Sequence, residues 1–156
     1  MIEILEKFTN VNLENVKNEV PTSKGIYLWT THKNEIVYIG IALGKKGLKH
    51  RICSQHLNPE YLEFRDTKHN SKDAFQLGHA VVKTRGNNKV KKGIDKSSFR
   101  KSIGRKMFIE PGVSTCKYIL DNLKLKVFAH EDATFVKELE KNLISLIQPI
   151  FNSTHK

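Results

Sequence analysis

Two tyrosines, one arginine and one glutamate have side chains suited to phosphate chemistry. Tyr27 and Tyr38 stand eleven positions apart in two predicted strands, while Arg51 and Glu140 fall in predicted helices. A guanidinium donates paired hydrogen bonds to phosphate oxygens, and a carboxylate is the hard oxygen ligand that Mg²⁺ prefers. A phenol, with a pKa of about 10, needs nearby cations to act as a base. Each residue is ordinary by itself, since a strand tyrosine is usually part of a core.

The elements that must position these residues can be read from the spacing of apolar residues. Runs rich in aromatic and β-branched residues at 25–31 and 35–42, joined by a short polar turn, predict a β-hairpin. Apolar positions 48, 52, 53 and 57 predict a helix over 48–57. A repeating apolar face predicts a last helix over 134–148, with Asp132 or Thr134 as its cap and Pro149 as its terminator.

The rest of the chain predicts a small α/β (α+β) domain. The further expected elements are a helix over 12–18 capped by Asn10 or Asn12, a strand over 75–82, a mobile basic loop over 85–95, a basic amphipathic helix opening at Ser97, a helix over 114–122 and a strand over 123–129. We therefore expect a central antiparallel sheet of about three strands flanked by helices. Residues 1–156 would form a single domain with a basic insert at about 58–122.

A strong positive charge makes nucleic acid the first partner to consider. The formal net charge of +11 comes from 27 Lys and Arg against 16 Asp and Glu, and the pI is about 9.7. Residues 83–106 hold ten of the cations and one acid, Asp95. Concentrated cations release counterions from a phosphate backbone, although a solvated basic loop is the alternative reading.

Other features narrow the class of protein. Cys53 and Cys116 form no C-x-x-C pair, so a zinc site is not indicated. The acidic N-terminus is unlike a secretory signal, and no apolar run reaches the ~18 residues that a membrane span needs. We expect reduced thiols and a cytoplasmic protein that does not enter membranes.

Two triplets in the predicted hairpin resemble those that name the GIY-YIG nuclease superfamily. Gly25-Ile26-Tyr27 and Tyr38-Ile39-Gly40 match both halves letter for letter. The segment 47–52 is similar to the family's arginine-bearing helix, 139–144 to its metal-binding helix, and 149–152 to its Pro-x-aromatic-Asn ending. Five segments in the family's order, from residue 25 to residue 152, make an accidental match improbable.

The resemblance implies a fold and a set of roles. It implies a GIY-YIG-like metal-dependent endonuclease that hydrolyses DNA phosphodiester bonds, with Glu140 holding Mg²⁺ or Mn²⁺. Glu140 lies twelve residues before Asn152, as the family's glutamate usually does, which distinguishes it from Glu138. Arg51 would stabilise the phosphate in the transition state. Tyr27 would be the general base with Tyr38 in support, although the sequence leaves the choice between them open.

Two departures from the family pattern motivate an alternative. Many members carry His or Tyr four residues after the arginine, where this chain has Gln55; His56 follows one position later and is the candidate for that role. Some members have Lys where this chain has Ile41, and the loop residues Lys45 and Lys46 can replace its charge. The alternative function is a catalytically inactive nucleic-acid-binding module with the same fold.

The expected partner is double-stranded DNA, bound by a monomer or by a homodimer that forms on the DNA. Asn152 would organise the end of the domain or touch the backbone of the site. The residues expected to contact nucleic acid are Lys45, Lys46, Arg100, Lys101, Arg105 and Asn152. A free-standing nuclease of a restriction or mobile-element kind is the expected biological setting.

Overall fold

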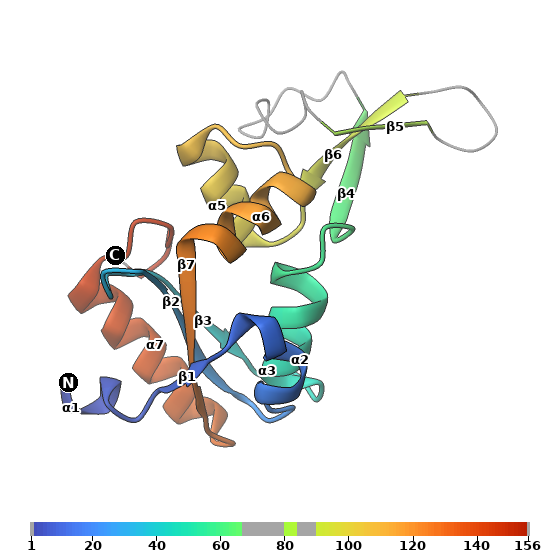
Figure 1. Ribbon diagram of the computed structural model, residues 1–156. Helices are drawn as coiled ribbons and strands as arrows, with labels where there is room; N and C mark the ends of the chain where they lie inside the picture. Colours follow the sequence, from blue (N-terminus) through green and yellow to red (C-terminus); the bar gives the residue numbers. More distant parts are fainter. Residues whose placement is uncertain (1, 67–79, 84–89, 156) are drawn as a thin grey trace. The chain divides into compact units, whose positions relative to one another are not determined.

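The chain divides into two compact units. The computed structural model describes residues 2–66, 80–83 and 90–155 (Figure 1). One unit, the core unit, consists of Met1–Ser54 and Ile119–Lys156, and the other, the insert unit, of Gln55–Tyr118. The insert unit nearly coincides with the basic insert that the sequence predicts at about 58–122. No helix among the described residues combines the length and the apolar character that crossing a membrane requires.

A four-stranded antiparallel sheet forms the centre of the core unit. Its strand order is β1-β7-β2-β3, with bounds Thr9–Val11 for β1, Leu123–Ala129 for β7, Gly25–Thr31 for β2 and Ile36–Ala42 for β3. The predicted hairpin is confirmed as β2 and β3, the strand predicted over 123–129 is β7, and the mixed α+β class is confirmed. β1 was not predicted, because three residues are too few to show an alternating pattern.

The helices of the core unit are short except for the last. They are α1 (Ile2–Leu5), the 3₁₀ helix η1 (Leu13–Asn15), α2 (Val16–Glu19), α3 (Gly47–Lys49) and α7 (Ala133–Ile147). The helix predicted over 12–18 is present as η1 and α2, and Asn12 is its cap, since its Oδ1 accepts from the backbone N–H of Glu14. For α7 the cap is Asp132, whose Oδ1 accepts from the N–H groups of Thr134 and Phe135 at 3.0 and 3.2 Å.

The sheet carries helices on both faces, which is why β2 is buried along Gly25–Thr30. Ile26, Leu28 and Ile39 face α7 and share an apolar core with it that includes Val136, Leu143 and Ile144. Side chains alternate along a strand, so Tyr27 points to the opposite face. There the start of α3 approaches β2 (Figure 1). The side chain of Leu48 lies against Gly25.

The segment that follows α3 is helical but not α-helical. The sequence predicts a single helix over 48–57, and the chain is indeed helical over 47–56. Only Gly47–Lys49 is α-helix, however, and His50–His56 is a π-helix, η2, with i→i+5 hydrogen bonds. A π-turn holds one residue more than an α-turn, so apolar spacing alone does not reveal it.

A second antiparallel sheet and two helices form the insert unit. The sheet has the order β4-β6-β5, with β4 at Leu62–Asp66, β5 at Ala80–Lys83 and β6 at Val90–Asp95. The helices are α5 (Ser98–Met107) and α6 (Val113–Asn122). The C-terminal end of α6 belongs to the core unit. The helices predicted from Ser97 and over 114–122 are confirmed. The loop predicted over 85–95 was wrong at 90–95, which pairs with two strands. The strand predicted over 75–82 is present at 80–82, while 75–79 and 85–89 lie outside the described residues.

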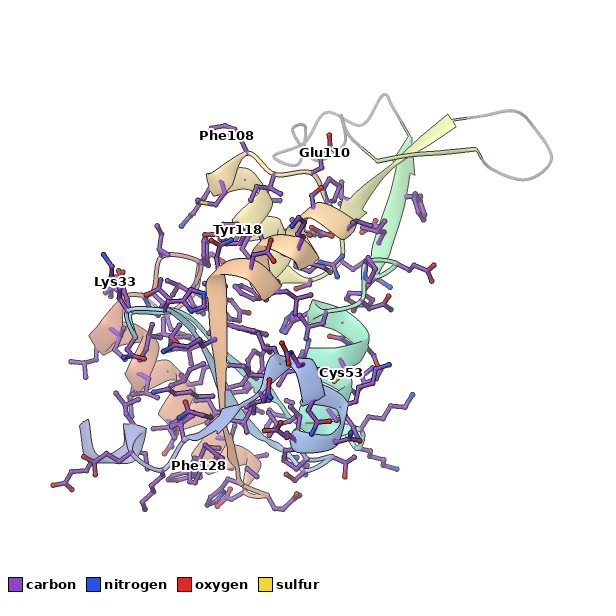
Figure 2. The ribbon with its side chains drawn as sticks, viewed as in Figure 1. Lys33, Cys53, Phe108, Glu110, Tyr118 and Phe128 are labelled. Carbon is purple, nitrogen blue, oxygen red and sulfur yellow. The ribbon has the colours of Figure 1, made fainter. Side chains whose placement is uncertain are left out.

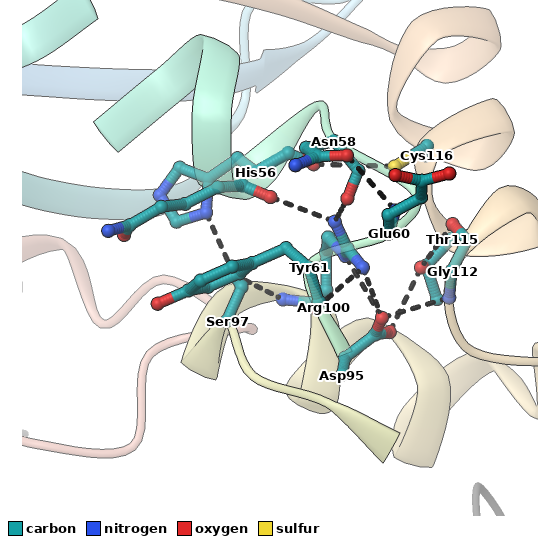
Figure 3. Close-up of polar contacts among 11 residues, drawn as sticks. His56, Asn58, Glu60, Tyr61, Asp95, Ser97, Arg100, Gly112, Thr115 and Cys116 are labelled. Atoms are coloured by element: carbon teal, nitrogen blue, oxygen red, sulfur yellow. Dashed lines mark hydrogen bonds and ion pairs between the residues drawn. The ribbon is translucent and has the colours of Figure 1, made fainter. Parts of the chain in front are cut away.

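A completely buried ion pair organises the insert unit (Figure 3). Asp95 ends β6, Arg100 lies in the first turn of α5, and both side chains are 0% exposed. Arg100 donates to Asp95 Oδ1 from Nε at 3.0 Å and from Nη2 at 2.5 Å. The same carboxylate accepts from the Gly112 N–H and the Thr115 hydroxyl, both at 2.9 Å. Asp95 thereby ties the end of a strand to both helices.

The remaining N–H groups of Arg100 bind backbone carbonyls. Nη1 donates to the oxygens of Gln55 (2.8 Å) and Asn58, and Nη2 donates to the oxygen of Tyr61 at 3.3 Å (Figure 3). All five donors of the guanidinium therefore have acceptors, which is the condition under which a buried ion pair is tolerated. The pair fixes the course of residues 55–61 into β4.

Removing this guanidinium should destabilise the protein. We expect Arg100→Met to lower the free energy of unfolding by about 3–5 kcal/mol, because the carboxylate of Asp95 stays buried without its counter-ion. Lys106→Met, an exposed position on the same helix, is the control and should change it by about 0.5 kcal/mol or less. Urea denaturation followed by circular dichroism measures both, and equal losses in the two variants would contradict the structural role of Arg100.

Candidate active site

Tyr27 and Tyr38 form a contacting pair on one face of the sheet. In the register of β2 with β3, Tyr27 lies opposite Gly40 and Trp29 lies opposite Tyr38. The ring centroids of the two tyrosines are 6.3 Å apart, and the planes are inclined by 35°. Their side chains are also linked by a hydrogen bond.

The glycines of the two triplets are required by close packing. A Cβ at Gly40 would overlap the Cζ and hydroxyl of Tyr27, so the ring lies directly over the glycine. A Cβ at Gly25 would overlap the carbonyl oxygen of Phe128 and come within 2.8 Å of Leu48 Cδ1. Both positions therefore require a residue without a side chain: Gly40 leaves room for the Tyr27 ring, and Gly25 leaves room for the Phe128 backbone and for Leu48.

Asn152 fastens the C-terminal segment to β3. Its Oδ1 accepts from the Ile39 N–H at 2.9 Å and its Nδ2 donates to the Ile39 carbonyl at 2.8 Å, while the Phe151 N–H donates to Val37 at 2.9 Å. Ile39 lies between Tyr38 and Gly40, so this contact holds the strand where the tyrosine pair depends on it. The expectation that Asn152 organises the end of the domain is confirmed. Its contact with nucleic acid stays a prediction, and its amide is buried inside the core unit.

Arg51 and Glu140 act electrostatically on both tyrosines. Arg51 is exposed on η2, and Glu140 is half-buried on α7. The pKa of Tyr38 is raised to about 12, chiefly by burial and then by Glu140, while Arg51 acts to lower it. For Tyr27, burial raises the pKa well above its ordinary value; Tyr38 and Glu140 also raise it and Arg51 lowers it. The structure thus brings together the four residues that the sequence singles out.

The pKa of the Glu140 carboxyl group is also shifted from its ordinary value. Burial raises its pKa, and His155 and Arg51 lower it without cancelling the shift. His155, an exposed residue in the left-handed conformation (φ 63°), is a neighbour that sequence reasoning missed. It follows Asn152 by three positions and belongs to no pattern, so only the path of the C-terminal segment reveals it.

His56, the predicted fifth member of the site, belongs to the insert unit. It is buried, its Nδ1 is 2.8 Å from Ser97 Oγ, and its ring meets Phe99 edge-on at 5.4 Å. Along the chain it follows Arg51 by five residues, at the end of η2. His56 is thus held by packing inside the insert unit, and its catalytic role stays a prediction.

The basic residues expected to contact nucleic acid differ in exposure. Lys45, Lys46 and Arg105 are exposed and Lys101 is half-buried, so their charges can meet a polyanion. The prediction that Arg100 contacts nucleic acid was wrong, because its guanidinium is buried and donates its hydrogen bonds to Asp95 and to backbone carbonyls. A cation count from the sequence does not separate these two kinds of arginine.

An open pocket of about 490 Å³ lies at the β1 side of the core unit. Three of the polar side chains that line it form these contacts: Lys124 Nζ donates to Asn34 Oδ1 at 2.7 Å, and His32 Nε2 is 3.2 Å from the carbonyl oxygen of Asp121. Neither tyrosine of the pair, nor Arg51, nor Glu140 lines it. The pocket is therefore a separate feature from the candidate site.

A comparison with protein-family models, with curated proteins and with solved structures finds no match for this chain. The candidate site therefore rests on the residues of this chain and on their geometry.

The packing of Tyr27 on Gly40 can be tested with two glycines of the same segment. We expect Gly40→Ala to lower the free energy of unfolding by about 1–3 kcal/mol, because the added methyl group displaces the buried ring. Gly44→Ala is the matched control, since a Cβ there meets nothing within 4 Å. Urea midpoints measure the difference, and the idea fails if the two variants are equally stable.

The raised pKa of Glu140 predicts how stability depends on pH. Below the ordinary carboxyl pKa, Glu140 is neutral in both the folded and the unfolded chain, so Glu140→Gln should change Tm little. As the pH rises through the folded-state pKa, ionisation costs the folded protein free energy, and the Gln variant should become the more stable of the two. The gain in Tm should therefore grow from pH 4 to pH 7.

Thermal melts at several pH values measure this difference. Glu138→Gln, an exposed position on the same helix, is the control. A Glu140→Gln variant that is less stable than the wild type at pH 7 would refute the burial penalty.

Proposed function

We propose that this chain is a metal-dependent endonuclease of the GIY-YIG type that hydrolyses DNA phosphodiester bonds. One observation carries the proposal: the hydrogen-bonded pair Tyr27 and Tyr38 lies within the electrostatic reach of both Arg51 and Glu140. These residues come from a hairpin, a π-helix and a late helix. Clustered titratable groups with shifted pKa values are more common at active sites than elsewhere.

Both tyrosines are hard to ionise, and this bears on how either of them accepts a proton. Burial raises the pKa of Tyr27 well above its ordinary value, and the pKa of Tyr38 is raised to about 12, chiefly by burial. The charge of Arg51 lowers the pKa of both. The resemblance favours Tyr27 as the base with Tyr38 in support. In either case the tyrosine acts as the phenolate, which takes a proton from the attacking water and becomes the neutral phenol.

Arg51 is suited to bind the phosphate that is attacked and to stabilise its charge. Its side chain is exposed, so its guanidinium can reach a backbone phosphate and donate two parallel hydrogen bonds to it. It stays charged throughout, and the charge that develops on the phosphate oxygens is stabilised without any proton transfer. Its positive charge also eases the loss of a proton from the tyrosine pair.

Glu140 is the residue that would hold a divalent cation. No group of three or more His, Cys, Asp and Glu side chains lies together in the part of the chain that the structure describes. A single half-buried carboxylate fits Mg²⁺ or Mn²⁺, since Mg²⁺ is commonly bound by one or two carboxylates, several waters and substrate phosphate. Such an ion would supply positive charge beside the scissile phosphate. Glu140 has to be ionised to hold it, so its raised pKa predicts that activity is lost in acid.

The proposal is tested by cleavage of plasmid DNA. Purified protein with Mg²⁺ or Mn²⁺ should nick or linearise the plasmid, and EDTA should stop it. Arg51→Ala should slow cleavage by about 10²- to 10³-fold through loss of charge stabilisation. Glu140→Gln should abolish cleavage, and both variants should retain salt-sensitive DNA binding.

Glu138→Gln is the control for Glu140→Gln and should cleave as the wild type does. If the wild type and Glu140→Gln are equally active or equally inert across metals and DNA forms, the enzyme proposal fails. Inertness of both together with retained binding would favour the inactive nucleic-acid-binding module.

A further inference from the structure

The pocket of about 490 Å³ beside β1 arises from the unequal lengths of two paired strands. β7 has seven residues and β1 only three, and their pairing stops at Val11 opposite Leu125. Asn12 then leaves the sheet, because its side chain caps η1. No strand among the described residues therefore lies against Leu123 and Lys124 on that side.

This space is named the β1 pocket. All of its lining residues belong to the core unit, and they lie within 10–14, 32–34 and 120–126.

Two lysines of β7 give the β1 pocket its positive charge. Lys124 and Lys126 lie two positions apart on one face of the strand, so their Cα atoms are about 7 Å apart. Lys124 Nζ donates one of its three N–H groups to Asn34 Oδ1 at 2.7 Å. Lys126 Nζ has neither a hydrogen bond nor an ion pair with any residue that the structure describes. Against these cations the described lining holds a single acid, Glu14. Two flexible ammonium groups at this spacing can close on one phosphate.

Other polar groups of the pocket suit the edge of a nucleobase. Asn10 lies opposite Lys126 in the register of β1 with β7, so its exposed amide is beside that lysine. The amide offers both a donor and an acceptor. His32 Nε2 lies 3.2 Å from the carbonyl oxygen of Asp121, which can only accept, so this nitrogen donates. The other ring nitrogen makes no hydrogen bond within the described part of the chain.

Two leucines add apolar surface to the same pocket. Leu120 of α6 is 48% exposed, and Leu13 of η1 is partly exposed. A flat nucleobase gains from such apolar contact, whereas inorganic phosphate would use the lysines alone. A purely apolar ligand would leave the lysines and amides without partners. The lining therefore complements a ligand that joins an anionic group to an apolar ring with polar edges.

We propose that the β1 pocket binds a nucleoside monophosphate, with the phosphate between Lys124 and Lys126 and the base against Leu13 and Leu120. The volume of about 490 Å³ suits a small organic ligand rather than a single ion. The nucleotide is either free in solution or the phosphorylated end of a DNA strand, since both present the same groups. The inference does not depend on the proposed function, because none of the four residues of the candidate active site lines this pocket.

The test is ligand binding by the full chain without divalent metal, measured by calorimetry and by the amide chemical shifts of NMR spectra. The probes are deoxyadenosine 5′-monophosphate, deoxyadenosine and inorganic phosphate. The monophosphate should bind more tightly than either of the others, and its shifts should gather at 10–14 and 120–126. Lys126→Met should weaken binding of the monophosphate about tenfold, because a charge-assisted hydrogen bond is lost. Lys126→Arg should retain most of the affinity.

Two further variants separate the apolar contact from the charge. Leu120→Ala should weaken the monophosphate about threefold and leave inorganic phosphate unchanged, because it removes apolar surface and no charge. Lys33→Met is the matched control for Lys126→Met. Lys33 stands between His32 and Asn34 but does not line the pocket, and Figure 2 shows its side chain at the outer end of the β2–β3 hairpin. It should leave the binding of every probe unchanged, and thermal melts establish that each variant is folded.

Several outcomes would overturn the inference, whether or not the protein cleaves plasmid DNA. If inorganic phosphate binds as tightly as the monophosphate, the pocket is an anion site and no base is bound. If deoxyadenosine binds as tightly, the lysines hold no phosphate. Equal losses in Lys33→Met and Lys126→Met would show a general effect of charge, and shifts confined to other segments would place the ligand elsewhere.

The two sources of the nucleotide are distinguished with an oligonucleotide. If a single strand with a 5′-phosphate binds more tightly than both its unphosphorylated form and the monophosphate, the ligand is a DNA end. If the monophosphate binds more tightly than the phosphorylated strand, the ligand is a free nucleotide. Either result supports the pocket as a nucleotide site.

Discussion

The core unit depends on one steric constraint: the ring of Tyr27 occupies the space that a side chain at residue 40 would need. That contact is possible only in the observed register of β2 with β3, because Tyr27 and Gly40 are then cross-strand partners. The same register brings Tyr38 to a ring distance of 6.3 Å. Asn152 holds the backbone between Tyr38 and Gly40 from the other end of the chain. The tyrosine pair is thus a consequence of strand register rather than of either triplet alone.

The π-helix after α3 is an element whose type the sequence did not reveal. The apolar spacing predicts a helix there, and the chain is helical, but His50–His56 has the i→i+5 hydrogen bonds of a π-helix. Gln55 and His56, the two positions at which the chain departs from the family pattern, both lie in this π-helix, so α-helical spacing does not describe where they point.

Some residues of the protein cost the folded state free energy. Others, whose charge would suggest exposure to solvent, are buried with all their hydrogen bonds made. Burial raises the pKa of Glu140, so its ionised carboxylate is an example of the first kind. Asp95 and Arg100 instead form a buried pair in which every guanidinium donor has an acceptor. Positions that cost the folded state free energy are where function is expected, while the fully hydrogen-bonded pair explains structure.

Local patterns in the sequence were enough for the hairpin, for β7, and for α5 and α7. These elements depend on spacings of two to four residues, which a single segment displays. The four residues of the candidate site were singled out only by the resemblance of five segments to a known family. Tertiary structure alone decided that β1 joins the sheet, that 90–95 is a strand, that Arg100 is buried and that His155 lies near Glu140. The reason is that strand pairing and burial depend on residues far apart in the chain, such as Asn152 and Ile39, which are 113 positions apart. No local pattern records such a partner.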